Sequence, residues 1–188
     1  MKITTGQKAP DFSLTDINGT KFKLENIKGK RCLLTFYRFA SCPFCNIRLH
    51  NLISNYDKFG DDFKIIAVFD SSLENLKNYA TRHKSPFPVL ADENNEIHRL
   101  YHIEHSLSGV IKGIVFRFPT LIASMLKGYI PWRIRGDITA MPADFLIDEE
   151  GIVQVAYYGR DEGAHLSVDL IKHFSHQRAE IVSDLIEV

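Results

Sequence analysis

Short, largely apolar runs and segments of helical periodicity follow one another along the first part of the chain. Residues 31–37 and 63–69 have the composition of buried strands, and the apolar positions between them recur at helical spacing. Strand, helix and strand in this order predict a βαβ unit with parallel strands and a right-handed connection. Before this unit, residues 12–24 alternate around the turn Asp16–Gly19 and predict an antiparallel edge hairpin.

The second part of the chain continues the same alternation of elements. Ser71 and Glu74 match a capping box, which predicts a helix with Ser71 as its N-cap, and the helix after residue 42 is expected to end near Gly60. The other predicted elements are a short edge strand at 87–90, a helix at 94–101, a β-hairpin of 143–148 and 152–158, and a last helix from Leu166 toward Ile186.

Length and charge narrow the class of protein. A chain of 188 residues suits one domain, here 1–188, and the 23 basic and 23 acidic residues leave no net charge that would attract nucleic acid. The first six residues lack the apolar core of a signal peptide, and three cysteines do not make a secreted disulfide framework. These features predict a protein of the reducing cytoplasm.

The stretch from Ser41 to Cys45 carries the clearest chemistry, because it places two thiols at the junction of a strand and a helix. Proline is favoured at the first helical position, so Pro43 predicts that Cys42 is the N-cap. There the helix dipole and the unpaired amides stabilise a thiolate, which lowers the pKa of Cys42. Cys45 lies one turn further on the same face and can close a disulfide. We therefore expect a redox-active dithiol.

Two other interpretations of the cysteines compete with this one. A structural zinc site needs about four ligands, and only Cys32 and His50 stand near enough in sequence to join the pair. Neither has convincing spacing. Free cysteines are also common in protein cores, and this is the interpretation we adopt for Cys32, which lies in an apolar strand.

The chain resembles the thioredoxin-like superfamily, and within it the peroxiredoxin-like alkyl hydroperoxide reductase and thiol-specific antioxidant (AhpC/TSA) family. The stretches that carry the resemblance are 6–14, 33–37, 87–92 and 142–151. The resemblance implies a thioredoxin-like α/β fold, with a mixed central sheet and helices on both faces. It also implies that Pro142 is a cis-proline packed beside the dithiol, and that the backbone of Met141 binds a thiol-bearing substrate.

One family feature is largely missing. Members resemble one another in a PxxxTxxC box and a later arginine that orient the peroxide, but this chain has Thr35, Phe39 and Pro142 at about those positions. Arg38 is the candidate that supplies the positive charge in their place, with Arg160 a weaker one. The alternative for Arg38 is a solvated surface group at a strand end.

These features predict a thiol-dependent oxidoreductase that needs no metal and no cofactor beyond an external thiol reductant such as thioredoxin, glutaredoxin or glutathione. In a peroxidase, Cys42 would attack a peroxide and Cys45 would resolve the product. In a thioredoxin-like or glutaredoxin-like exchange protein, Cys42 would attack a substrate disulfide. A non-catalytic scaffold or membrane-peripheral module is the alternative from another class.

Residues 103–136 fall outside the resemblance and predict an inserted amphipathic segment of two helical pieces, separated near Pro119. Between His105 and Gly136 the segment holds basic residues and no acidic one; the basic residues are Lys112, Arg117, Lys127, Arg133 and Arg135. We expect the apolar face to cover the core near Cys42 or to form a homodimer interface. The alternative is that this segment, which includes Trp132, contacts an anionic membrane surface or an acidic partner.

Overall fold

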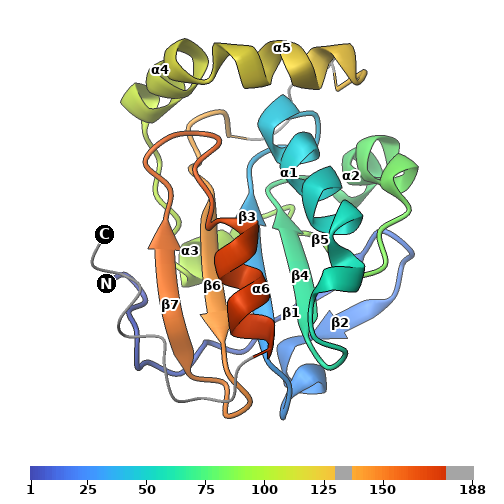
Figure 1. Cartoon of the computed structure of the whole chain (residues 1–188), viewed down its shortest axis with the longest axis vertical. Helices are drawn as coiled ribbons and strands as arrows, with labels where there is room; N and C mark the ends of the chain where they lie inside the picture. Colours follow the sequence, from blue (N-terminus) through green and yellow to red (C-terminus); the bar gives the residue numbers. More distant parts are fainter. Residues whose placement is uncertain (130–136, 177–188) are drawn as a thin grey trace.

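The computed structural model describes residues 1–129 and 137–176, which form one mixed sheet of seven strands (Figure 1). The strands are β1 (Ser13–Asp16), β2 (Lys21–Lys23), β3 (Cys32–Tyr37), β4 (Lys64–Phe69), β5 (Val89–Ala91), β6 (Ala143–Ile147) and β7 (Val153–Tyr158). Their order is β2-β1-β5-β4-β3-β6-β7, with β3, β4 and β5 parallel and the remaining pairs antiparallel. The predicted βαβ unit and both predicted hairpins are confirmed.

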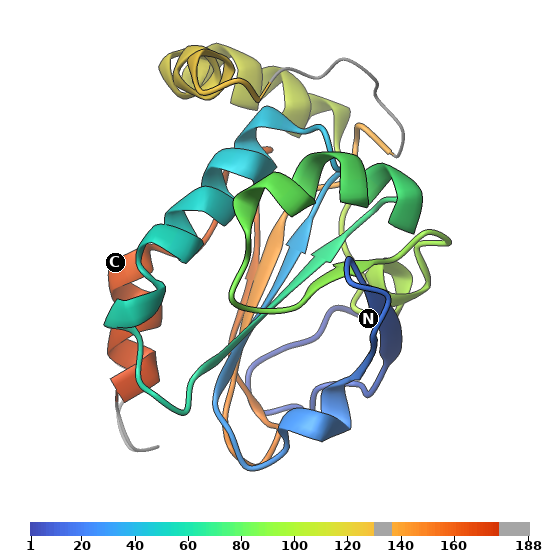
Figure 2. The ribbon, with the colours of Figure 1, turned by 90° about the vertical axis from the view of Figure 1, so that its right-hand side faces the viewer.

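Helices cover both faces of this sheet, as the resemblance to the thioredoxin-like superfamily implies (Figure 2). They are α1 (Pro43–Ser54), α2 (Leu73–Ala80), α3 (Glu96–Leu100), α4 (Leu107–Phe116), α5 (Phe118–Leu126) and α6 (Val168–His176), with 3-10 turns at Leu24–Ile27, Tyr56–Lys58 and Thr81–His83. Helices α1, α2 and α6 pack on one face, and α3 lies on the other with the N-terminal segment. Helices α4 and α5 lie across the end of the sheet, above the start of α1.

The central strand β3 explains why its sequence reads as an unbroken apolar run. Every residue of β3 is buried, because helices cover both sides of the sheet. Leu33 and Tyr37 join the core beneath α1, whereas Leu34 and Phe36 join the core on the α3 side. The strand is therefore packed on both faces, and it holds the start of the segment that carries Cys42 and Cys45 in a fixed position.

Strand β5 was predicted to be an edge strand, and this is wrong. It lies between β4 and β1, because the N-terminal hairpin adds to its outer side through the pairing of Asp16 with Leu90. The amide of Ile17 extends this contact by donating to the Val89 carbonyl at 3.0 Å. The sequence of the N-terminal hairpin does not indicate that β1 pairs with β5, since this pairing joins residues far apart in the chain.

Two helix ends also differ from the predictions. The N-cap of α2 is Ser72, whose hydroxyl accepts from the Asn75 amide at 3.3 Å, while the Ser71 hydroxyl accepts instead from the Asn75 side chain. Helix α1 ends at Ser54 and a 3-10 turn carries the chain on toward Gly60. The predicted extension of the last helix toward Ile186 lies outside the described residues.

The inserted segment forms two helices, as predicted, but it turns its apolar side chains outward. Gly109, Gly113 and Ser124 are buried against the body of the protein, and Leu121 packs beside α1. The large side chains that are exposed are Leu107, Ile111, Ile114, Val115, Phe116, Phe118, Ile122 and Leu126. The expectation that the apolar face covers the core is therefore wrong for most of this face. Trp132, Arg133 and Arg135 lie outside the described residues.

A buried carboxylate ties the central strands to the chain before α6. Asp144 on β6 is fully buried and accepts hydrogen bonds from the Thr35 hydroxyl at 2.6 Å and from the Leu166 amide at 2.8 Å. The His165 ring lies 3.0 Å away, and the Arg48 guanidinium lies 3.6 Å away. Burial opposes ionisation of Asp144, but His165, the charge of Arg48 and the Thr35 hydroxyl outweigh it and lower the pKa of Asp144 to about 2. Burial lowers the pKa of His165 itself, so the hydrogen bond from its ring is the contribution that does not depend on its charge.

This arrangement predicts a pH-dependent contribution to stability. At neutral pH, Asp144→Asn should lower the free energy of unfolding by about 3–5 kcal/mol, because it leaves buried partners uncompensated. The pKa of Asp144 is lower in the folded state than its ordinary value of 3.8. The advantage of the wild type is therefore complete above that value, and should shrink by about 2 kcal/mol as the pH falls toward 2. Urea unfolding of both proteins between pH 7 and pH 2 measures this, and a constant difference would contradict it.

Candidate active site

Cys42 occupies the N-cap of α1, as predicted. Its backbone is extended, Pro43 begins the helix, and the Asn46 amide donates to the Cys42 carbonyl at 3.0 Å. The sulfur makes no cap hydrogen bond of ordinary geometry, although it lies near enough to the Cys45 amide for that group to favour the thiolate. The strand before it and the proline after it together fix where this sulfur points.

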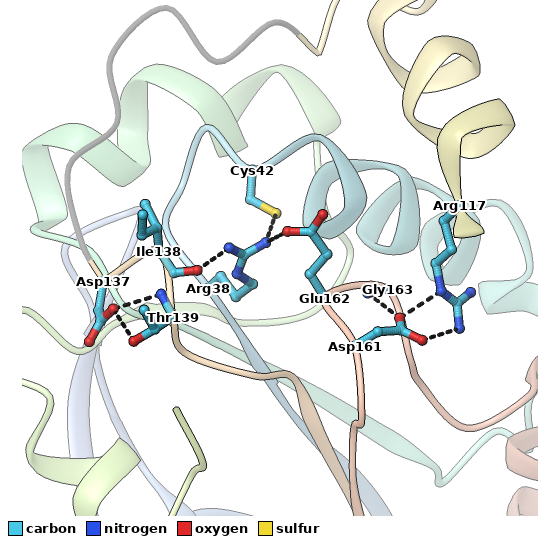
Figure 3. Close-up of polar contacts among 9 residues, drawn as sticks. All are labelled: Arg38, Cys42, Arg117, Asp137, Ile138, Thr139, Asp161, Glu162 and Gly163. Atoms are coloured by element: carbon cyan, nitrogen blue, oxygen red, sulfur yellow. Dashed lines mark hydrogen bonds and ion pairs between the residues drawn. The ribbon is translucent and has the colours of Figure 1, made fainter. Parts of the chain in front are cut away.

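Arg38 supplies the positive charge beside Cys42. It follows β3 directly, its side chain is 3% exposed, and its Nη1 lies 3.8 Å from the Cys42 Sγ (Figure 3). The guanidinium also donates to the Ile138 carbonyl and lies over the Phe39 ring, with 5.2 Å to its centroid. The alternative of a solvated surface arginine is therefore wrong.

The two thiols differ in their tendency to ionise. Burial opposes the charged form of Cys42, but the hydrogen bond from the Cys45 thiol and the charge of Arg38 outweigh burial and lower the pKa of Cys42. Burial raises the pKa of Cys45 well above its ordinary value, and the neighbouring Cys42 thiolate raises it further. At a pH between the two pKa values, the dithiol therefore holds its negative charge on Cys42 and its proton on Cys45, which is the state needed for nucleophilic attack by Cys42.

Cys32 stands apart from this pair. It begins β3, so the length of the strand, about 17 Å, separates it from the dithiol. It is buried, and burial raises the pKa of its thiol. A disulfide requires its two Cα atoms within about 7 Å, so Cys32 cannot bridge to Cys42 in this fold.

Glu162 completes the site, and no pattern in the sequence pointed to it. It lies in the loop after β7, is 4% exposed, and pairs with Arg38 (Figure 3). Burial raises the pKa of Glu162, and Arg38 partly offsets that effect. The preceding loop residue, Asp161, is held by Arg117 on the α4–α5 bend, whose Nε donates to the Asp161 carboxylate at 2.6 Å. Arg38 and Glu162 are 124 residues apart in the chain, so no local pattern could pair them.

Pro142 is not a cis-proline. The described residues contain no cis peptide bond, and the chain enters β6 with the ordinary trans bond at Met141–Pro142. Backbone contacts hold both sides of this bond: the Met141 amide donates to the Glu104 carbonyl at 2.7 Å, and the Gly159 amide donates to the Pro142 carbonyl at 2.8 Å. The Met141 amide is therefore already paired within the protein, and substrate binding by this backbone stays a prediction.

Neither Arg160 nor a metal cluster adds to the site around the dithiol. Arg160 is exposed, so it does not share the buried environment of Arg38. Within 1–129 and 137–176, no group of three or more histidine, cysteine or acidic residues is arranged to hold a metal ion. The candidate site thus consists of Cys42, Cys45, Arg38 and Glu162.

Comparison with known proteins shows what this chain is similar to. The profile of the AhpC/TSA family matches residues 5–156. Among curated proteins, the chain is similar to chloroplastic peroxiredoxin Q of Sedum lineare, with 29% identity over 113 residues, which is 60% of this chain and 61% of the relative. It is also similar to peroxiredoxin Bcp of Bacillus subtilis, with 31% identity over 104 residues, which is 55% of this chain and 66% of that protein. The chain thus spans less than two thirds of the length of these relatives.

The fold has solved counterparts as well. The crystal structure of peroxidoxin BcpB from Mycobacterium tuberculosis matches with a TM-score of 0.61, at 16% sequence identity, and the match covers 83% of this chain and 86% of that one. At this level of identity the match supports the fold alone.

Arg38 should control the ionisation of Cys42. Replacing Arg38 by Met keeps the length and apolar volume of the side chain but removes its charge, so the pKa of Cys42 should rise. Titration of the thiolate by its ultraviolet absorbance measures this without requiring a reagent to reach the buried sulfur. Arg160→Met, at an exposed arginine, is the matched control and should leave the titration unchanged.

A thiolate titration that survives in Cys42→Ser would show that the low-pKa thiol is misassigned. An unchanged titration in Arg38→Met would remove Arg38 from the site.

Mild oxidation should join Cys42 to Cys45 within one chain and leave Cys32 as a thiol. The reason is distance, since Cys42 and Cys45 lie together at the first turn of α1, whereas Cys32 lies at the far end of β3. Peptide mapping under non-reducing conditions identifies the bond. A bridge that contains Cys32, or a disulfide-linked dimer as the main product, would contradict this assignment.

Proposed function

This chain belongs to the AhpC/TSA family, and from that premise we propose that it is a thiol peroxidase in which Cys42 attacks the peroxide and Cys45 resolves the product. The observation that carries the proposal is the contact between Arg38 Nη1 and Cys42 Sγ at 3.8 Å. A cation at this distance stabilises the attacking thiolate. It is also placed to stabilise the negative charge that develops on the departing oxygen.

In the first step the Cys42 thiolate attacks one oxygen of the peroxide. An S–O bond forms as the O–O bond breaks, and Cys42 is oxidised by two electrons to a sulfenic acid. The second oxygen leaves as an alkoxide or hydroxide and takes a proton from solvent. Arg38 faces these charges in a buried site, where electrostatic contacts are stronger than in water.

In the second step Cys45 attacks the sulfenic sulfur. An S–S bond forms, and the sulfenic hydroxyl leaves as water together with the thiol proton of Cys45. The high pKa of Cys45 keeps this thiol protonated until the Cys42 thiolate has been consumed. An external thiol reductant, such as thioredoxin, glutaredoxin or glutathione, then restores the dithiol, and no metal or organic cofactor takes part in either step.

Disulfide exchange is the second candidate function, and the residues around the thiols are the observation that favours it. The family's peroxide-orienting threonine is replaced by Phe39, whose ring lies under Arg38. Thr35, at about the position of the family's proline, also carries a hydroxyl, but this hydroxyl donates to Asp144 in the core and not to a group beside the thiols. An exchange protein needs only the low-pKa Cys42 and the resolving Cys45, and both requirements are met without an orienting hydroxyl.

Turnover of hydrogen peroxide should depend on Cys42 and should be slow for this family. Cys42→Ser should reduce turnover to the uncatalysed background, because no other described thiol has a lowered pKa. Cys45→Ser should complete one oxidation and then stop, because the sulfenic acid is not resolved. Cys32→Ala is the control and should keep its activity. The turnover of the three variants is measured with hydrogen peroxide and a thiol reductant, and in parallel with a model disulfide in place of the peroxide.

Without the orienting threonine, the rate constant for peroxide should fall far below the diffusion ceiling of about 10⁸–10⁹ M⁻¹ s⁻¹. A rate constant near that ceiling would contradict the expectation that Arg38, without the orienting threonine, supports only slow peroxide turnover. Turnover of the disulfide with none of the peroxide would favour exchange. Full partner binding by Cys42→Ser with no turnover of either substrate in the wild type would favour a scaffold.

A further inference from the structure

The outer side of α4 and α5 is an exposed apolar surface. We call it the α4–α5 face, and it consists of Leu107, Ile111, Ile114, Val115, Phe116, Phe118, Ile122 and Leu126. Phe116 is 79% exposed and Leu126 is 84% exposed. Single exposed apolar side chains are common on proteins, but a continuous set of large ones marks a surface that contacts another apolar phase.

This outward orientation is built into the packing of the two helices. A Cβ added at Gly109 would lie 2.6 Å from the Met141 sulfur, and one added at Gly113 would overlap the Glu162 side chain. Only glycine allows the backbone of α4 to lie this close to the loops beneath it. The inner side of α4 is therefore filled by backbone, and the large side chains have no position but the outer side.

The segment is also anchored at its start, bend and end. The Ser106 amide donates to the Thr139 carbonyl at 2.7 Å, and Arg117 at the bend pairs with Asp161 at 2.6 Å. At the far end Tyr129 is buried, with the Arg82 guanidinium 4.6 Å from the centre of its ring. The α4–α5 face is thus held outward by ordered contacts on the opposite side of the segment.

The charges around this face are all of one sign. Lys112 and Lys127 are exposed and pair with none of the acidic side chains in the described part of the chain, whereas Arg117 is neutralised by Asp161. No acidic residue occurs anywhere between His105 and Gly136. The surface therefore combines apolar side chains with uncompensated cations, the composition typical of a helix that lies on an anionic lipid surface.

The shape of the segment fits a position on a membrane and not across it. Helices α4 and α5 measure about 15 Å and about 14 Å at 1.5 Å per residue, against about 30 Å for the hydrocarbon core. Among the described residues, no one helix has the length and hydropathy of a span. Helices α4 and α5 reach that length and hydropathy only together, with a bend of 76° between them.

We propose that the α4–α5 face docks the protein on the surface of an anionic phospholipid bilayer. The apolar side chains insert at the boundary between head groups and acyl chains, and Lys112 and Lys127 contact the lipid phosphates. A second copy of this chain fits less well, because a two-fold contact would set the face against itself. The lysines would then meet lysines, and the segment offers no carboxylate to pair with them.

Flotation with lipid vesicles tests the proposal without using the dithiol chemistry. The full chain should bind vesicles that contain phosphatidylglycerol at low salt, and should bind pure phosphatidylcholine vesicles much more weakly. Raising the salt concentration should weaken binding, because the contribution of the lysines is screened. No binding to the anionic vesicles at low salt, or equal binding to both kinds, would overturn the proposal.

Paired variants separate the apolar and the charged contributions. Phe116→Gln with Leu126→Gln should weaken binding about a hundredfold, because two large side chains no longer enter the lipid. Lys112→Gln with Lys127→Gln should weaken it about thirtyfold.

The controls are matched to these changes and lie on other surfaces. Leu100→Gln is the control for Ile122→Gln, which changes a residue of the α4–α5 face, since both residues are 41% exposed. Lys21→Gln with Lys77→Gln removes two exposed lysines elsewhere. These two controls should bind like the wild type, and equal losses in control and test variants would overturn the proposal. A wild-type dimer that Phe116→Gln with Leu126→Gln dissociates, with no vesicle binding, would overturn it in favour of a self-association surface.

Discussion

The contact on which this site depends is that between a buried guanidinium and a buried thiolate. An isolated charge costs several kcal/mol to bury, so neither Arg38 nor an ionised Cys42 would be stable alone at this depth. Each compensates the other. Glu162 accepts from Nη1 of Arg38 and the Ile138 carbonyl accepts from Nη2, whereas the buried Nε has no hydrogen-bond partner among the described residues. The loops that carry these partners therefore have to lie over the start of α1 to hold Arg38 beside Cys42.

This requirement explains the arrangement of the elements above the dithiol. Glu162 reaches Arg38 from the loop after β7, and that loop is held by Arg117 through Asp161 (Figure 3). Gly113 lets α4 lie directly on Glu162, and Gly163 leaves room for the Arg117 side chain. The inserted segment thus excludes water from the ion pair on its inner side. Its large apolar side chains are displaced to the outer side as a consequence of that close packing.

The sequence predicted the parts of this structure that depend on neighbours in the chain. The N-cap position of Cys42 follows from Pro43 and the strand before it. Arg38 directly follows that strand and precedes Cys42 by four residues, so it is also a neighbour in the chain. Glu162 could not be found in this way, because it meets Arg38 only through the tertiary fold. Helical periodicity groups the apolar residues of 107–126 on one face but does not say which face is buried. The glycines at 109 and 113, one turn apart, were the signal that the opposite face packs inward.

The charges of the site also bear on its oxidation. When Glu162 and Cys42 are both ionised, the reduced site holds two anions and one cation, Arg38. The Glu162 carboxylate raises the pKa of Cys42 against the lowering effect of Arg38. Forming the disulfide removes the thiolate and leaves Arg38 and Glu162 as a balanced pair. The carboxylate therefore destabilises the reduced state relative to the disulfide, while Arg38 does the reverse. Their opposing effects set how readily an external thiol can restore the dithiol, and neither residue belongs to the CPFC stretch itself.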